Sequence, residues 1–291
     1  MSGKEHWTSK GDVKLFLWQK PAAGAPRGTI LFVHGSSMAS QPTFDLQVPG
    51  RADSSVMEWF AARGFDCWCM DHEGYGRSDK SRPINCDISN GADDIATASA
   101  YIGGKLLVYG ISSGALRAAL FTQRHPERVA RLALDAFVWT GEGSPTLAER
   151  RKKLAEFSAK NRRPIDRAFV KSIFTRDHPG TADEATINAF ADAILALDDS
   201  VPTGTYVDMC SRLPLVDPAK IPVPTLVMRG EYDGIAGFDD LVEFYKRLPN
   251  ADKQFSVMAG ISHASFQQKN YLTAYHILHA FFTQPAPVYR G

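Results

Sequence analysis

Residues 106–120, LLVYGISSGALRAAL, change character at their centre. The first part is a short apolar run typical of a buried strand, and the last part carries small and apolar side chains at helical spacing. Between them, GISSG at residues 110–114 fits the pattern G-x-S-x-G. We expect an abrupt turn that holds Ser112 in a sparsely populated backbone conformation and exposes its hydroxyl, with glycine at 110 and 114 because side chains there would collide. The alternative is an ordinary turn in which Ser112 only caps the helix.

Apolar runs of four to eight residues alternate with longer amphipathic segments along most of the chain. This pattern predicts an α/β fold with a mostly parallel sheet flanked by helices. Strands are expected at residues 13–18, 28–35, 65–71, 105–110, 129–138, 224–230 and 253–260, and helices at 57–64, 113–125 and 271–284.

Residues 144–212 interrupt this alternation, because they contain four helix-like stretches and no convincing strand. The first stretch opens with Ser144 and Pro145, an N-cap followed by proline at the first helical position. We therefore expect a helical cap, residues 139–214, inserted into a core made of residues 1–138 and 215–291. The basic clusters ERRKKLAEF and KNRR in this insertion are expected on a solvated helix face, and the alternative is a guide for anionic substrates.

A serine hydroxyl is a weak nucleophile near neutral pH and needs a base to accept its proton. The preferred base is His263 in AGISHASF, because it directly follows the last expected strand and a loop there can reach the carboxyl edge of the sheet. The other histidines considered are His72, a less well supported base, His125 at a helix end, and His276 and His279 on the last helix.

The base in turn needs a carboxylate that orients it. Asp233 in GEYD directly follows the strand at 224–230, and it gives the order serine, aspartate, histidine that is typical of hydrolases on a parallel sheet. Glu231 and Asp135, each near a strand end, are the alternatives.

An acyl transfer also needs hydrogen-bond donors for the oxygen that becomes negative. The backbone N–H groups of Ser113 and Ser36 are the expected pair, with Gly35 permitting close approach of the backbone. His34 is expected to fix this loop rather than act on substrate. The segment 36–55 that follows is long and irregular, so Ser37 and Met38 remain neighbouring alternatives for the second donor.

These motifs together resemble those of the α/β-hydrolase family over essentially the full chain: HGSS, DHEGYGRSD (residues 71–79), GISSG, GEYD and GISH, in the family's order. The resemblance implies that Ser112, His263 and Asp233 are nucleophile, base and acid, that Ser36 and Ser113 form the oxyanion hole, and that the insertion is a cap. Relatives that attack through an aspartate at the turn are disfavoured, as are lipases with an HGGG loop.

We expect a cofactor-free serine hydrolase that cleaves a small to medium, largely apolar carboxylic ester or lactone through an acyl-enzyme. The alternatives are an amidase or C–C bond hydrolase with the same triad, a lyase or perhydrolase, and a receptor-like binding protein with slow turnover. Candidate substrate-binding residues are Ser37, Met38, Phe137, Trp139, Tyr206, Met209 and Ile235.

Composition excludes other functions. The 33 basic and 32 acidic residues leave a net charge of +1, so no nucleic-acid partner is expected. No apolar run approaches the length of a membrane span, and the N-terminal residues lack the apolar region of a secretory signal. The four cysteines, Cys67, Cys69, Cys86 and Cys210, are expected to be buried thiols, with no metal site. We expect a cytoplasmic enzyme with a small-molecule substrate, and a homo-oligomer remains open.

Overall fold

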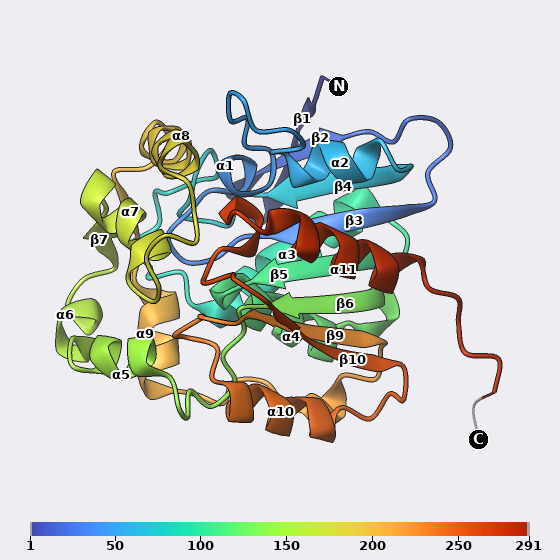
Figure 1. Cartoon of the computed structure of the whole chain (residues 1–291). Helices are drawn as coiled ribbons and strands as arrows, with labels where there is room; N and C mark the ends of the chain where they lie inside the picture. The colour runs from blue at the N-terminus through green and yellow to red at the C-terminus, as the bar shows by residue number, and fades with distance from the viewer. Residues whose placement is uncertain (1, 290–291) are drawn as a thin grey trace.

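A computed structural model of the protein describes residues 2–289. Eight strands form one sheet in the order β1-β2-β4-β3-β5-β6-β9-β10 (Figure 1). β2 pairs antiparallel with β1 and β4, and all other neighbours are parallel. The strands are β1 Lys4–Lys10, β2 Val13–Lys20, β3 Gly28–Val33, β4 Phe65–Met70, β5 Leu106–Ile111, β6 Val129–Asp135, β9 Thr225–Gly230 and β10 Lys253–Met258. The expected mostly parallel sheet is therefore present.

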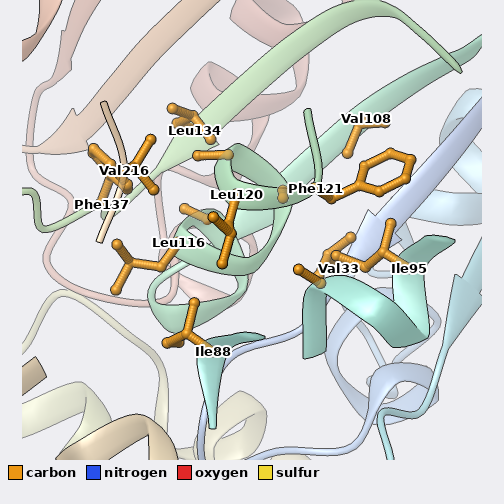
Figure 2. Packing of buried hydrophobic residues seen from close by; sticks show 14 of the residues in the cluster. Val33, Ile88, Ile95, Val108, Leu116, Leu120, Phe121, Leu134, Phe137 and Val216 are labelled. Carbon is orange, nitrogen blue, oxygen red and sulfur yellow. The ribbon is translucent and has the colours of Figure 1, made fainter. Parts of the chain in front are cut away.

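Helices cover both faces of the sheet (Figure 1). One apolar cluster joins the inner strands to α3, α4 and α10, and a second joins them to α2 and α11. The bounds are α1 Ser40–Phe44, α2 Val56–Ala61, α3 Ile88–Ile102, α4 Ser113–Arg124, α10 Phe238–Arg247 and α11 Tyr271–Thr283. Figure 2 shows the first cluster, in which Leu116 and Leu120 of α4 pack between Leu134 of β6 and Ile88 of α3. This packing fixes α4 against the end of β5, where the expected turn lies.

Between β6 and β9 the chain forms the helices α5 Pro145–Arg151, α6 Leu154–Ser158, α7 Arg167–Thr175, α8 Glu184–Leu195 and α9 Gly204–Ser211. They lie together beyond the end of the sheet at which the parallel strands terminate (Figure 1). The Ser144 hydroxyl accepts a hydrogen bond from the Leu147 N–H, which is the expected N-cap. The division of the chain into core and cap at 139–214 stays a prediction.

The expectation that this insertion contains no strand is wrong. β7 Arg162–Pro164 and β8 Ser200–Pro202 pair antiparallel as a two-stranded sheet. Each is only three residues long, and their arginine, serine and proline residues give no apolar run that would indicate a strand. The first expected helix is also two short helices, α5 and α6.

Two features outside the insertion also differ from the pattern expected from the sequence. β1 is an edge strand whose polar residues carry no alternating apolar face, so nothing in its pattern indicates pairing. β6 ends at Asp135 rather than at residue 138, because Ala136 has a positive φ of 51°. All four cysteines are buried and free, as expected. Within residues 2–289 no helix is long and apolar enough to cross a membrane.

Candidate active site

Ser112 stands at the junction of β5 and α4 with φ 57° and ψ −127°, a conformation that costs about 1–3 kcal/mol for a residue with a side chain. A Cβ at Gly110 would lie 2.5 Å from the Gly114 carbonyl oxygen, and one at Gly114 would collide with the carbonyl oxygen of Val33. The expected reason for the two glycines is therefore confirmed. Ser112 does not cap α4 with its side chain, so the hydroxyl remains available for chemistry.

His263 and Asp233 form a direct pair at the carboxyl edge of the sheet. Nδ1 of His263 lies 3.0 Å from Oδ2 of Asp233, and Oδ1 accepts hydrogen bonds from the N–H groups of Ile235 and Ala236 at 2.9 and 3.3 Å. Burial raises the pKa of Asp233, but His263 and the Ile235 N–H outweigh this effect and lower the pKa to about 2. The ionised carboxylate thus holds Nδ1 and leaves Nε2 to accept a proton.

Hydrogen bonds from Arg51, in the irregular segment 36–55, hold the loop that carries His263. The Arg51 guanidinium donates hydrogen bonds to the carbonyl oxygens of Phe266, Gln267 and Gln268 at 3.0, 3.2 and 2.8 Å. Leu46 and Val48 of the same segment pack against α7 and α8. This segment therefore contacts the insertion and also supports the loop that carries His263.

Ser112 and His263 line the same small cavity of about 10 Å³, roughly the space of one water molecule. Ser36, Ser37, Met38 and four residues of the insertion complete its wall. No hydrogen bond joins the Ser112 Oγ to His263 within residues 2–289. Catalytic hydrogen bonds often tighten only in the Michaelis complex, so the shared cavity is the informative observation.

Asp135, the main alternative acid, is fully buried and turned to another partner. Its Oδ2 accepts a hydrogen bond from the Tyr109 hydroxyl at 2.6 Å, and burial raises its pKa to about 6. Its backbone carbonyl accepts the Ser112 N–H at 2.9 Å, so it supports the backbone of the turn. Glu231 accepts the Gly260 N–H instead. Of the three carboxylates, Asp233 is the one hydrogen-bonded to His263.

The HGSS loop lies directly against the turn that carries Ser112. A Cβ at Gly35 would be 3.3 Å from the Ser112 Cβ, and the Ser36 hydroxyl donates to the Ser113 hydroxyl at 2.5 Å. Among residues 2–289 no acceptor takes up the Ser36 N–H, and Ser113 is the first residue of α4, where N–H groups have no helical partner. Both N–H groups are thus free to bind an oxyanion.

His34 fixes this loop, in keeping with its expected role. Its Nδ1 lies 2.8 Å from the Gly35 carbonyl oxygen, and its Nε2 accepts the His72 N–H at 3.1 Å. Burial lowers the pKa of both imidazoles, which therefore stay neutral. The remaining rivals lie elsewhere: His276 and His279 pack on Trp59, and His125 packs on Phe121.

Four of the expected pocket residues belong to the core. The first apolar cluster contains the buried side chains of Phe137, Trp139, Met209 and Ile235, and Figure 2 shows Phe137 among them. None of the four lines the small cavity beside Ser112 or the larger cavity of about 590 Å³. Apolar residues next to a strand end suit a core and a pocket equally well, so the sequence could not separate the two roles. Ser37, Met38 and Tyr206 do line the small cavity.

A second cavity of about 590 Å³ lies within the insertion, whose residues form nearly all of its wall, and Arg150, Arg176 and Tyr206 line both cavities. Arg163 and the apolar rings of Phe157 and Phe169 line only the larger one. The basic clusters ERRKKLAEF and KNRR were expected on a solvated face. That holds for Arg151 and Lys152 but is wrong for Arg150 and Arg163, which face the cavity. The spacing of charges in α5 could not show which side faces inward.

Residues 24–270 match the model of a family described as serine aminopeptidase, S33. A thermophilic esterase from Thermogutta terrifontis has a TM-score of 0.69 at 20% identity, over 97% of this chain and 98% of that one. An esterase from Exiguobacterium antarcticum has 0.72 at 17%, over 97% and 100%, and the thioesterase domain of the curacin biosynthetic pathway has 0.70 at 15%, over 98% and 100%. No curated protein sequence matches the chain.

Proposed function

The chain belongs to the serine aminopeptidase S33 family of α/β-hydrolases and is a hydrolase, and from this premise we propose that it cleaves a small to medium carboxylic ester or lactone through an acyl-enzyme. The observation that carries the proposal is the Asp233–His263 pair beside a strained Ser112 in one cavity. The solved esterases and the thioesterase of the same fold support an ester as the bond that is cleaved.

In the proposed reaction, His263 Nε2 takes the Ser112 proton as Oγ attacks the carbonyl carbon. The carbonyl oxygen becomes negative between the N–H groups of Ser36 and Ser113, each of which contributes about 3 kcal/mol of transition-state stabilisation. Asp233 stabilises the imidazolium, which then protonates the leaving alcohol. Water activated by the same imidazole attacks the acyl carbon, releases the acid and restores the serine.

The family description raises cleavage of peptides from a free amino end as a second candidate. That reaction needs an anionic group close to the nucleophile to bind the substrate ammonium. Among residues 2–289, no carboxylate lines the small cavity beside Ser112, and its wall does contain the guanidinium groups of Arg150 and Arg176. These cations would repel an ammonium group, so an ester is the better fit.

Labelling with a fluorophosphonate tests the mechanism. We expect rapid, stoichiometric modification of Ser112 and turnover of p-nitrophenyl butyrate that falls about 10⁴- to 10⁶-fold in Ser112→Ala. Arg151→Gln is the matched control, because this arginine is exposed and lines neither cavity. Undiminished hydrolysis by purified Ser112→Ala would exclude the proposed nucleophile.

A further inference from the structure

We propose that the ester substrate carries a carboxylate at a distance from the cleaved bond, and that Arg150, Arg163 and Arg176 bind this carboxylate beside the nucleophile. The inference rests on the proposed function and names the substrate class for the same site. We place this carboxylate on the acyl part of the ester, which makes the substrate a monoester of a dicarboxylic acid.

Three guanidinium groups from separate elements gather around one phenol. Arg150 comes from α5, Arg163 from β7, and Arg176 directly follows α7. The guanidinium carbons of Arg150 and Arg163 lie 4.5 and 4.2 Å from the centre of the Tyr206 ring. Like charges brought together in this way repel one another, so an anion that binds among them gains more than it would at a lone arginine.

Several N–H groups of these arginines have no hydrogen-bond partner among residues 2–289. Nε and Nη2 of Arg176 and Nε of Arg163 are buried and donate no hydrogen bond within residues 2–289. Arg163 donates through Nη2 to the Ser37 hydroxyl at 2.6 Å, and the Nε of Arg176 lies 3.5 Å from Asp177 in an ion pair. Buried donors are nearly always satisfied in proteins, so the unpaired ones point to an acceptor supplied by a ligand. A carboxylate offers two oxygens for planar guanidinium groups.

The charges of the cavity are arranged so that its inner end is cationic. Glu149 and Glu156 lie exposed at the outer part, and Glu149 is already paired with Lys152 at 2.5 Å. Asp177 accepts a hydrogen bond from the Thr146 hydroxyl at 2.7 Å. The wall shared with the nucleophile's cavity contains Arg150, Arg176 and Tyr206 and no acidic side chain.

The pKa of the Tyr206 phenol is lowered by the positive charges of the same arginines. Burial raises its pKa, but the charges of Arg150, Arg163 and Arg176 outweigh burial and lower the pKa to about 7. An environment that stabilises a phenolate also stabilises a carboxylate. Since Arg150 and Arg176 line both cavities, a carboxylate held by them lies next to the space in which Ser112 attacks.

Two esters with the same scissile bond test the proposal. These are p-nitrophenyl hydrogen adipate, which has a free carboxylate, and p-nitrophenyl methyl adipate, in which that carboxylate is capped. We expect the wild-type enzyme to prefer the free carboxylate at least tenfold in kcat/KM. Arg176→Gln and Arg150→Gln should reduce this preference toward one, while Arg151→Gln on the same helix as Arg150 keeps it. Equal kcat/KM values for the two esters in the wild-type enzyme would overturn the proposal.

A binding measurement separates this proposal from the catalytic one. We expect Ser112→Ala to bind monomethyl adipate in calorimetry, and the dissociation constant to rise with ionic strength. Dimethyl adipate should bind at least tenfold more weakly. Equal dissociation constants for the two adipates would overturn the carboxylate site even if fluorophosphonate labels Ser112. Full turnover by Ser112→Ala would overturn the proposed function but would leave the binding result unchanged. Neither the binding comparison nor the turnover of Ser112→Ala uses an arginine variant, so neither depends on such a variant folding.

Discussion

The hydroxyl of Tyr75 donates a hydrogen bond to the carbonyl oxygen of Ser36 at 3.1 Å. This bond links the DHEGYGRSD motif to the loop whose N–H is the proposed oxyanion donor. The Tyr75 oxygen lies 3.5 Å from the fully buried guanidinium of Arg117, which also donates to the His34 carbonyl oxygen at 3.4 Å. A chain of buried polar groups therefore holds the two peptide groups on either side of the one that carries the Ser36 N–H.

Tyr75→Phe should lower kcat more than it changes KM. The substitution removes the hydrogen bond to the Ser36 carbonyl and loosens the Ser36–Ser37 peptide. This peptide follows directly on the one that carries the Ser36 N–H, so we expect the proposed oxyanion donor to be less well aligned. Because the donor itself remains, we expect a loss of roughly 10-fold, smaller than the 10²- to 10³-fold typical of losing a donor outright. Steady-state kinetics with p-nitrophenyl butyrate measure the effect. A rise confined to KM would contradict this role for Tyr75.

Asp233→Asn and Asp135→Asn should have very different effects on turnover. The first substitution removes the carboxylate that accepts from His263 Nδ1, and comparable changes in serine hydrolases lower kcat about 10⁴-fold. The second leaves that contact intact and should cost less than roughly 10-fold. Kinetics of the two variants on the same ester decide the matter. A larger loss for Asp135→Asn would transfer the role of the acid to Asp135.

The stability of the protein should also depend on Asp135 in a pH-dependent way. Its pKa is raised to about 6 by burial, so the folded state binds more protons than the unfolded state between about pH 4 and pH 6. Stability contributed by the protonated form is complete below pH 4 and is lost as the pH rises through 6, by as much as ~3 kcal/mol. Asp135→Asn should remove this slope in urea unfolding measured from pH 4 to pH 8. An unchanged slope would refute the assignment.

The sequence motifs predicted more of this site than the hydrophobic periodicity did. Gly110, Ser112 and Gly114 demand a backbone that only a strand-to-helix turn satisfies, and the carboxyl ends of parallel strands meet at one edge, so Asp233 and His263 could be paired in advance. The arrangement of the insertion could not be predicted in the same way. Which side of α5 faces inward depends on how short helices pack over the sheet, and the periodicity of a seven-residue helix is too brief to show it.

The expected apolar pocket illustrates the same limit. Phe137 and Trp139 follow β6 directly, a position from which a side chain can turn toward the site or into the core. Both pack on Phe244 of α10, a helix that the sequence analysis did not identify, with ring centres 4.8 and 5.8 Å apart. Only long-range packing decides between these two outcomes, and no local pattern records it.

Finally, the preference for an anionic ester should depend on the ionisation of Tyr206. The charged groups that face this phenol are Arg150 from α5, Arg163 from β7 and Arg176 after α7, and the Ser37 hydroxyl lies 3.5 Å from its oxygen. When the pH is below the Tyr206 pKa of about 7, the phenol is neutral and the guanidinium groups are free to bind a carboxylate. Above this pH the phenolate neutralises part of the charge of the guanidinium groups and repels the substrate.

The ratio of kcat/KM for p-nitrophenyl hydrogen adipate to that for p-nitrophenyl methyl adipate should therefore fall on the order of tenfold between pH 6 and pH 8.5. Taking the ratio cancels every pH dependence that the two esters share, because they have the same scissile bond. In Tyr206→Phe the ratio should be independent of pH, and a wild-type ratio that is flat across this range would show that Tyr206 does not titrate beside the bound carboxylate.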